Sequence, residues 1–200
     1  MSIEITLAIT GASGAPYAKR LLQVLLDKQV TVHLLVSKAA LMVLAQEDNT
    51  PWPSNHDKMK QHIRETLSTK GQLHVYGKED WSSPVASGSG APETMIICPC
   101  SMGSMAAIAT GQCDNLIERA ADVALKESNK LIIVPRETPL SEIHLKNMLT
   151  LKQAGALILP ASPGFYHQPK SIEDLIDFIV ARILKAAGIK QELLAPWGRG

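Results

Sequence analysis

Residues 7–22 read LAITGASGAPYAKRLL and join an apolar run to a helical pattern through a tight glycine turn. The run before the turn favours a buried strand, and after the turn leucines recur at helical spacing. The N–H groups at the start of a helix attract anions, and glycine lets the backbone approach an anion closely. The stretch therefore predicts a strand, an anion-binding turn and a helix. The alternative is a glycine turn that only allows the strand and helix to pack closely.

Short β-branched runs and amphipathic helical patterns alternate along the rest of the chain. We predict strands at residues 3–10, 31–36, 73–76, 95–98, 131–134 and 156–159, and helices at 16–28, 38–46, 58–68 (exposed), 101–110, 116–127, 141–154 and 171–187. This alternation predicts one α/β domain over residues 1–200, a Rossmann-like three-layer sandwich with a mostly parallel sheet. Right-handed crossovers then bring the strand-to-helix loops to one edge of the sheet, where ligands of such sheets bind.

The composition excludes several classes of protein. A formal net charge of +1 gives no field suited to nucleic acid or an anionic membrane, and no apolar run approaches the roughly 18 residues that span a bilayer. The start, MSIEITLAIT, lacks the features of a signal peptide. Three cysteines cannot form a disulfide framework, and Cys98 and Cys100 match neither zinc nor redox spacing. We expect a cytoplasmic protein with reduced cysteines and no metal, nucleic acid or membrane partner.

The glycine turn differs from the fingerprint of dinucleotide-binding proteins. Its G-A-S-G-A spacing is not G-x-G-x-x-G, and the strand that ends at Val36 is followed by Ser37 and Lys38 rather than by an acidic residue for a ribose diol. A hydroxyl and a cation suit a phosphate better than a diol. A nucleophilic role for Ser13 on this pattern alone is weaker, because G-x-S-x-G would need glycine in place of Ala15.

Several cations suggest a second anion site. Arg119 and Lys126 share one helical face with Asp122, a pattern that by itself is typical of a solvated face. Other polar side chains follow predicted strands at the ligand-bearing edge or lie in the last helix, and arginine is suited to forked phosphate contacts. These are Arg136, Glu137, Tyr166 and Arg182.

The three tryptophans lie outside the predicted core patterns. Trp81 stands in a Ser/Gly-rich loop, DWSSPVASGSGAPE, where it could stack on a flat ring or contact another subunit. Trp52 and Trp197 are expected at the surface or at an interface.

Taken together, these motifs resemble the flavin prenyltransferase family, the flavoproteins of the UbiX type. The resemblance spans nearly the whole chain and rests on an ordered set: TGASGAPYAKRLL, VSKAA, ASGSGAP, CPCSMGS, ERAADVALKE, VPRETPL and PGFYHQPKS. It implies that the phosphate belongs to FMN. It further implies that a dimethylallyl group passes from dimethylallyl phosphate to N5 and C6 of reduced FMN, without a metal. The product would serve a partner decarboxylase of the UbiD type.

The resemblance also assigns site residues. Implied flavin contacts are Gly11, Ala12, Ser13, Ser37, Met102, Gly103, Ser104, Met105 and Arg136. Implied contacts to the prenyl phosphate are Tyr166, Arg182, Arg119, Lys126 and Glu137, and the implied catalytic group is Lys126, Glu137, Arg119, Trp81 and Ser13. The family forms large homo-oligomers, commonly dodecamers, in which this tryptophan reaches a neighbouring subunit's pocket.

Two other functions remain open. One is an FMN-dependent decarboxylase of the cysteine-decarboxylating flavoproteins, which share the fold and the flavin site. The other is a passive FMN carrier, which would need no second anion site.

Overall fold

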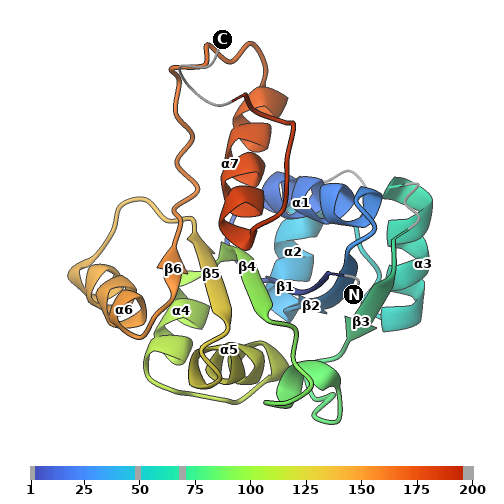
Figure 1. The fold of residues 1–200 in the computed structure, drawn as a ribbon, viewed down its shortest axis with the longest axis vertical. Helices are drawn as coiled ribbons and strands as arrows, with labels where there is room; N and C mark the ends of the chain where they lie inside the picture. Colours follow the sequence, from blue (N-terminus) through green and yellow to red (C-terminus); the bar gives the residue numbers. More distant parts are fainter. Residues whose placement is uncertain (1–2, 48–50, 68–70, 196–200) are drawn as a thin grey trace.

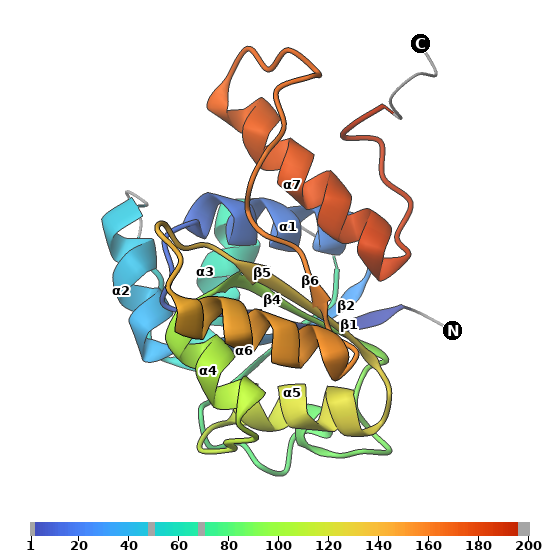
Figure 2. The same ribbon diagram turned by 90° about the vertical axis from the view of Figure 1, so that its left-hand side faces the viewer.

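The computed structural model describes residues 3–47, 51–67 and 71–195. One central sheet lies between two layers of helices (Figures 1 and 2). Its strands are β1 Glu4–Ile9, β2 Thr31–Val36, β3 Leu73–Tyr76, β4 Thr94–Cys100, β5 Lys130–Pro135 and β6 Leu157–Ile158. The helices are α1 Ala15–Asp27, α2 Lys38–Glu47, α3 His56–Leu67, α4 Met102–Ala109, α5 Leu116–Lys126, α6 Glu142–Gln153 and α7 Ile172–Ala187, with a 3-10 turn at Pro84–Ala86.

The strand order is β3-β2-β1-β4-β5-β6, and the described strands all pair in parallel. From β1 the chain moves outward through β2 to β3, then returns to the other side of β1 and moves outward through β4 to β6. The reversal between β1 and β4 is the topological switch point of such sheets, where the loops on either side diverge and leave a crevice.

The two faces of the sheet have separate cores. Because side chains alternate along a strand, Leu7 of β1 packs in a cluster with Ile183 of α7, whereas the adjacent Ala8 packs in another cluster with Met105 of α4 and Ala121 of α5. In Figure 2, α1 and α7 accordingly lie on one side of the sheet, and α4, α5 and α6 lie on the other.

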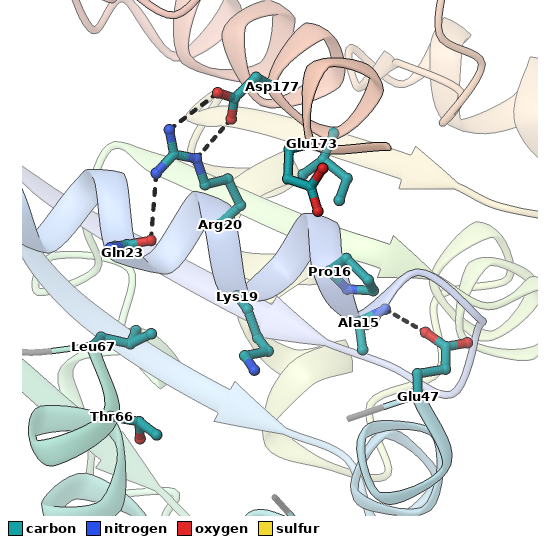
Figure 3. Close-up of a pocket in the computed structure, with 11 residues that line it drawn as sticks. Ala15, Pro16, Lys19, Arg20, Gln23, Glu47, Thr66, Leu67, Glu173 and Asp177 are labelled. Atoms are coloured by element: carbon teal, nitrogen blue, oxygen red, sulfur yellow. Dashed lines mark hydrogen bonds and ion pairs between the residues drawn. The ribbon is translucent and has the colours of Figure 1, made fainter. Parts of the chain in front are cut away.

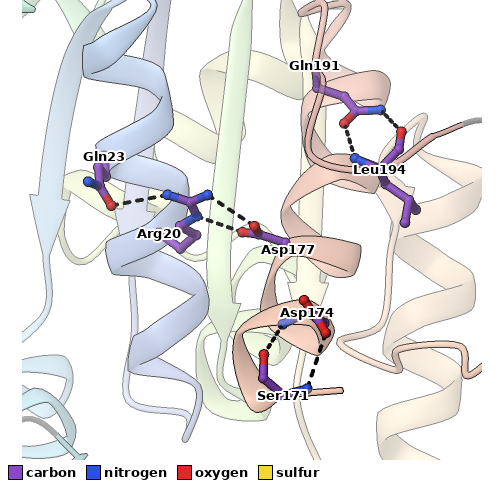
Figure 4. A network of polar contacts seen from close by, with 7 residues as sticks. All are labelled: Arg20, Gln23, Ser171, Asp174, Asp177, Gln191 and Leu194. Carbon is purple, nitrogen blue, oxygen red and sulfur yellow. Dashed lines mark hydrogen bonds and ion pairs between the residues drawn. The ribbon is translucent and has the colours of Figure 1, made fainter. Parts of the chain in front are cut away.

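A forked ion pair joins α1 to α7 (Figure 4). Arg20 of α1 donates to the carboxylate of Asp177 at 2.6 and 3.0 Å. Ser171 caps the start of α7, where its hydroxyl accepts from the Asp174 amide at 3.2 Å. Partly exposed ion pairs contribute little to stability, so the pair mainly fixes which turn of α7 faces α1.

The sequence predictions for the elements are confirmed to within a few residues, and the fold is the predicted α/β sandwich. Two details are wrong. The third helix is not fully exposed, because Met59 and Ile63 are 1% exposed, and its predicted last residue, Ser68, lies outside the described residues. Trp52 is 6% exposed and packs in the core, whereas Trp197 lies outside the described residues. No described helix is long and apolar enough to cross a membrane.

The switch point is held together by the buried Thr10, which is 1% exposed. Its hydroxyl donates to the Pro99 carbonyl oxygen at 2.9 Å and accepts from the Ser101 amide at 2.7 Å. Thr10 directly follows β1, and Pro99 lies near the end of β4. One hydroxyl therefore joins the loops that leave the two central strands.

We predict that Thr10→Val destabilises the fold by about 1–3 kcal/mol, because valine keeps the shape but leaves the partly buried Ser101 amide without its acceptor. Urea unfolding followed by circular dichroism measures this loss. Thr110→Val is the matched control: this exposed residue directly follows α4, and its hydroxyl donates to the Ala106 carbonyl oxygen at 2.9 Å, so its loss should cost about 0.5 kcal/mol or less. Equal losses for the two variants would contradict the role given to Thr10.

Candidate functional site

Three helices begin directly after three neighbouring strands, so their first turns meet at the carboxyl edge of the sheet. They are α1 after β1, α2 after β2 and α4 after β4. The Ser37 hydroxyl accepts from the Ala40 amide of α2 at 3.0 Å, and the Ser101 hydroxyl accepts from the Ser104 amide of α4 at 3.3 Å. The Ser101 hydroxyl in turn donates to the Ser104 hydroxyl at 3.1 Å, whereas the Ser37 hydroxyl can donate its own proton to a ligand. The edge therefore presents helix N-termini and hydroxyl groups together.

The glycine turn after β1 lies against the start of α2. A Cβ atom at Gly11 would stand 2.5 Å from the Cβ of Ala39, so only glycine fits there. Gly14 has a φ of 126°, which a residue with a side chain rarely adopts. Ala12 is buried and Ser13 is exposed. The turn thus presents Ser13 outward and holds its backbone close to α2.

The N-terminus of α1 already has an anion, which is the carboxylate of Glu47 at the end of α2 (Figure 3). Glu47 accepts from the Gly14 amide at 3.0 Å and from the Ala15 amide at 2.8 Å. The expectation that the amides at the start of this helix are open to a ligand phosphate is therefore not met. The N-termini of α2 and α4 remain for that role.

The surroundings of Glu47 keep it charged. Burial by itself raises the pKa of this carboxyl, but hydrogen bonds from Ser13, Gly14 and Ala15 and the positive charge of Arg136 hold the pKa below its usual value. Sequence reasoning missed Glu47, since it lies more than 30 positions from its partners and its local pattern is that of an ordinary helix end.

A cavity of about 280 Å³ opens beside the caps of α2 and α4. It is lined by Ser37 and Lys38 from one side, by Ser104 from another, and by Tyr76 and Lys78 from the end of β3 and the loop after it. Hydroxyl groups, a helix N-terminus and lysines are suited to a phosphate. This cavity brings together two of the predicted flavin contacts, Ser37 and Ser104.

The predicted contacts of α4 lie at different depths. Gly103 is exposed and Ser104 is partly exposed, so both are accessible from the edge. Met102 is 8% exposed, and Met105 is 0% exposed within the core. Met105 thus lies beneath the site, and its contact with a flavin stays a prediction.

Arg136, Glu137, Tyr166 and Arg182 form a strip that leads through two adjacent cavities from the glycine turn to α7. Arg136, directly after β5, donates through Nε to the Ser13 carbonyl oxygen at 3.0 Å. Arg136 and Glu137 line a cavity of about 120 Å³. Pro160 and Ser162 line both this cavity and a larger one of about 790 Å³, whose lining includes Tyr166 and Arg182. The structure therefore brings four of the predicted residues, Arg136, Glu137, Tyr166 and Arg182, to adjacent cavities.

The remaining predicted residues lie elsewhere. Arg119 donates to the Ala86 carbonyl oxygen at 3.3 Å and pairs with Asp122 at 2.9 Å, while Lys126 pairs with the adjacent Glu127. Both cations belong to α5, whereas Arg182 belongs to α7 on the opposite face of the sheet (Figure 2).

Trp81 is 48% exposed and stands in the loop that continues into the 3-10 turn against α5. A single chain does not bring Trp81, Arg119 and Lys126 to the cavities of Tyr166 and Arg182.

Two of the three cysteines lie in the core, and the described residues form no metal-binding cluster. Within the ranges that the structure describes, no group of three or more His, Cys, Asp or Glu side chains is arranged to hold a metal ion. Cys98 and Cys100 are 0% exposed, and burial raises the pKa of the Cys100 thiol to about 12. Both are core residues.

Comparison with known proteins identifies the family. The flavoprotein family model matches residues 1–184. The flavin prenyltransferase UbiX of Pseudomonas aeruginosa is 56% identical over 98% of this chain and 94% of its own.

Solved structures agree. A UbiX protein in complex with FMN and dimethylallyl pyrophosphate has a TM-score of 0.88 and 42% identity, over 99% of this chain and 98% of its own. A dodecameric FMN-dependent UbiX-like decarboxylase from Escherichia coli O157:H7 has a TM-score of 0.85 and 36% identity, over 98% of this chain and 99% of its own. This chain therefore belongs to the flavoprotein family and, within it, to the flavin prenyltransferases of the UbiX type.

Proposed function

We propose that this protein joins a dimethylallyl group from a prenyl phosphate to N5 and C6 of reduced FMN. The observation that carries the proposal is the strip from Ser13 through Arg136 and Glu137 to Tyr166 and Arg182. It sets an anion-binding surface directly beside the edge where a flavin would lie. A passive FMN carrier has no use for such a surface.

The residues present fit FMN. The cavity at Ser37 and Ser104 suits its phosphate, because the N-termini of α2 and α4 and two lysines surround it. Because Gly11 carries no side chain, the glycine turn can lie directly against Ala39 at the start of α2, beside this cavity. The α1 amides are held by Glu47, so we place the phosphate at α2 and the ring nearer to Ser13 and Arg136. When bound, reduced FMN supplies the nucleophilic N5 and C6 atoms.

The chain's own residues act on the donor. Tyr166 and Arg182 bind its phosphate, and Lys126 and Arg119 complete the cationic group. As the C–O bond of the donor breaks, its electron pair leaves with the phosphate, and preorganised cations stabilise the negative charge that develops. Positive charge on the prenyl carbons is stabilised by the ring face of Trp81. These cations neutralise the leaving group, so the proposal needs no metal ion.

Bonding the prenyl group to N5 would release the N5 proton with the phosphate, and closing the second bond at C6 would remove a proton from C6 while the prenyl double bond takes one up. Glu137, which lines the small cavity next to Arg136, and the released phosphate are the two acceptors within the proposed site. Both are compatible with the same overall product.

The donor carries one phosphate in our sequence-based expectation, whereas the relative with a TM-score of 0.88 was crystallised with dimethylallyl pyrophosphate. Both donors have the same allylic carbon and the same C–O bond to break. We propose a dimethylallyl monophosphate or diphosphate as the substrate class. The prenylated flavin would then serve a decarboxylase of the UbiD type.

We further propose that the active site is shared between copies of the chain. The cations of α5 lie on the opposite face of the sheet from α7, so Lys126 reaches Arg182 only if the α5 of one copy packs beside the α7 of another. Exposed Trp81 stands in the loop whose 3-10 turn packs against α5, and it would enter the neighbour's site with α5. The dodecameric relative supports a homo-oligomer.

We predict that the protein binds FMN more tightly than FAD, and that Ser37→Ala weakens FMN binding by roughly 1–3 kcal/mol, because a hydroxyl donor to a charged phosphate is lost. Calorimetry measures both affinities. Ser171→Ala is the matched control, since Ser171 also accepts from an amide at a helix start but caps α7 rather than α2. Equal affinity for FAD, or equal weakening by both alanine variants, would contradict this placement of the phosphate.

We predict that anaerobic enzyme with dithionite-reduced FMN, dimethylallyl phosphate and EDTA forms prenylated flavin and inorganic phosphate. Lys126→Ala should slow the reaction on the order of 10²–10³-fold, the usual effect of removing one preorganised group that stabilises charge. Lys152→Ala, at the end of α6, is the control that should keep the wild-type rate. The mass of the extracted flavin is the readout. An unchanged flavin mass, or a strict need for magnesium, overturns the mechanism and favours the flavin-dependent decarboxylase.

We predict that two inactive variants restore activity when they are co-expressed. In a randomly mixed oligomer of Lys126→Ala and Arg182→Ala chains, roughly one site in four combines an intact Lys126 with an intact Arg182. A mixture of Lys126→Ala and Arg119→Ala chains is the control and should stay inactive, because both residues come from the same α5. Light scattering should give a mass of several chains. A fully active monomer would rule out sharing.

A further inference from the structure

The carboxyl edge of the sheet arranges the parts of the proposed FMN site in a row. In the order of the strands, Arg136 follows β5, the first turn of α4 follows β4, the glycine turn follows β1 and Ser37 follows β2. The row ends at β3, which is an edge strand (Figure 1). With the ring placed near Ser13 and Arg136 and the phosphate at Ser37, a group bonded to the far side of that phosphate would extend toward β3.

Tyr76, the last residue of β3, stands at this end of the row. Together with Gly77 and Lys78 it lines the cavity of about 280 Å³ that Ser37 and Ser104 also line. Ligand pockets generally span about 300–1,000 Å³. This cavity is therefore of a size for a phosphate and part of a sugar chain, with little space for an adenylate as well.

Hydrogen bonds across three strands hold the Tyr76 ring. His33 of β2, whose side chain is 6% exposed, has Nδ1 at 3.1 Å from the Tyr76 hydroxyl and Nε2 at 3.1 Å from the carboxylate of Glu4 in β1. Because a carboxylate only accepts, Nε2 donates to Glu4, and the neutral imidazole accepts the Tyr76 proton at Nδ1. The rings of His33 and His74 stack with that of Tyr76 at centroid distances of 5.8 and 6.4 Å. The Tyr76 ring is thus fixed although β3 is an edge strand.

The turn after Tyr76 is fixed as well. The Gly77 amide donates to the Asp80 carboxylate at 2.6 Å. The Lys78 carbonyl oxygen accepts at 2.9 Å from the amide of Leu116, the first residue of α5. This end of the cavity therefore consists of a held ring and of backbone that is bonded to a second element, and widening it would break these hydrogen bonds.

We propose that Tyr76 and the turn after it determine the preference of this protein for FMN over FAD, because they close the cavity directly beyond the phosphate. The inference rests on the proposed function for the placement of the flavin. The phosphate of FMN ends in the cavity, whereas the diphosphate of FAD would continue into the space that the Tyr76 ring occupies. Moving the ring costs its hydrogen bond to His33 and its ring contacts, so FAD is rejected by a clash.

The test measures the binding of oxidised FMN and FAD to the full-length protein freed of flavin, so that no prenyl transfer accompanies it. Calorimetry gives both affinities for each variant. Tyr76→Val and Tyr76→Thr remove the ring and keep a β-branched side chain suited to a strand, whereas Tyr76→Phe keeps the ring. His74→Val is the matched control, because His74 lies on the same strand and in the same ring stack but is not among the residues that line the cavity.

Tyr76→Val and Tyr76→Thr should tighten FAD binding, so that the ratio of FMN affinity to FAD affinity falls roughly tenfold or more. Their affinity for FMN should change less than about threefold, and Tyr76→Phe and His74→Val should keep the wild-type ratio within about threefold. An unchanged ratio without the ring, or an equal loss of affinity for both flavins, would show that Tyr76 does not close the cavity. A fall as large in His74→Val would assign the effect to the ring stack. Each of these results overturns the proposal.

Failure of the proposed function is read separately. If the wild type makes no prenylated flavin from reduced FMN and a dimethylallyl donor, the assignment of prenyl transfer fails, and the affinity ratio of Tyr76→Val still decides whether Tyr76 closes the cavity. If prenylated flavin forms but Tyr76→Val keeps the wild-type ratio, only the role of Tyr76 is wrong.

Discussion

At the switch point of the sheet, the Thr10 hydroxyl donates to Pro99 and accepts from Ser101, and so joins the ends of β1 and β4. The loops that leave these strands carry the glycine turn on one side and the first turn of α4 on the other. In a parallel sheet the two loops would otherwise diverge, since their helices cover opposite faces. The hydroxyl keeps them at a fixed separation in a site from which water is excluded, where an unmade hydrogen bond is costly. The positions of Ser13 and Ser104 relative to each other depend on this contact.

Glu47 adds a second constraint at the same edge. A helix N-terminus without a partner would leave unsatisfied amides and a partial positive charge, and at α1 the Glu47 carboxylate supplies both the acceptor and the charge. Its interaction with Arg136 lowers its pKa further and ties α2 electrostatically to the loop after β5. Because Arg136 also donates to the Ser13 carbonyl oxygen, the loops after β1 and β5 are held together without a ligand. The edge is thus preorganised, which lowers the cost of ordering it on binding.

The periodicity of the sequence was sufficient for the elements and the order of layers, because strand and helix patterns in this chain are strong and separated by clear turns. Ser37 and Ser104 could be placed at one edge for the same reason, since each follows a strand of a parallel sheet. Glu47 could not be found, because a contact between the end of α2 and the start of α1 depends on tertiary packing. Nor could the sequence tell that α5 and α7 cover opposite faces, because this follows from the strand order on either side of β1.

Because α5 and α7 cover opposite faces of the sheet, their cations stay apart within a single chain. Arg119 is held by Asp122 and the Ala86 carbonyl oxygen, and Arg136 by the Ser13 carbonyl oxygen, so these guanidinium groups have partners before any ligand arrives. Placing the cations of α5 and α7 together in one monomer would bring like charges close without an anion between them, at an energetic cost that grows as water is excluded. In our proposal the two groups meet only across a subunit boundary, where the phosphate of the donor lies between them. In this proposal, assembly brings the cations of α5 and α7 together, and the donor phosphate binds to these same cations. In the proposed oligomer these cations lie close together, and binding of an anion between them relieves their repulsion.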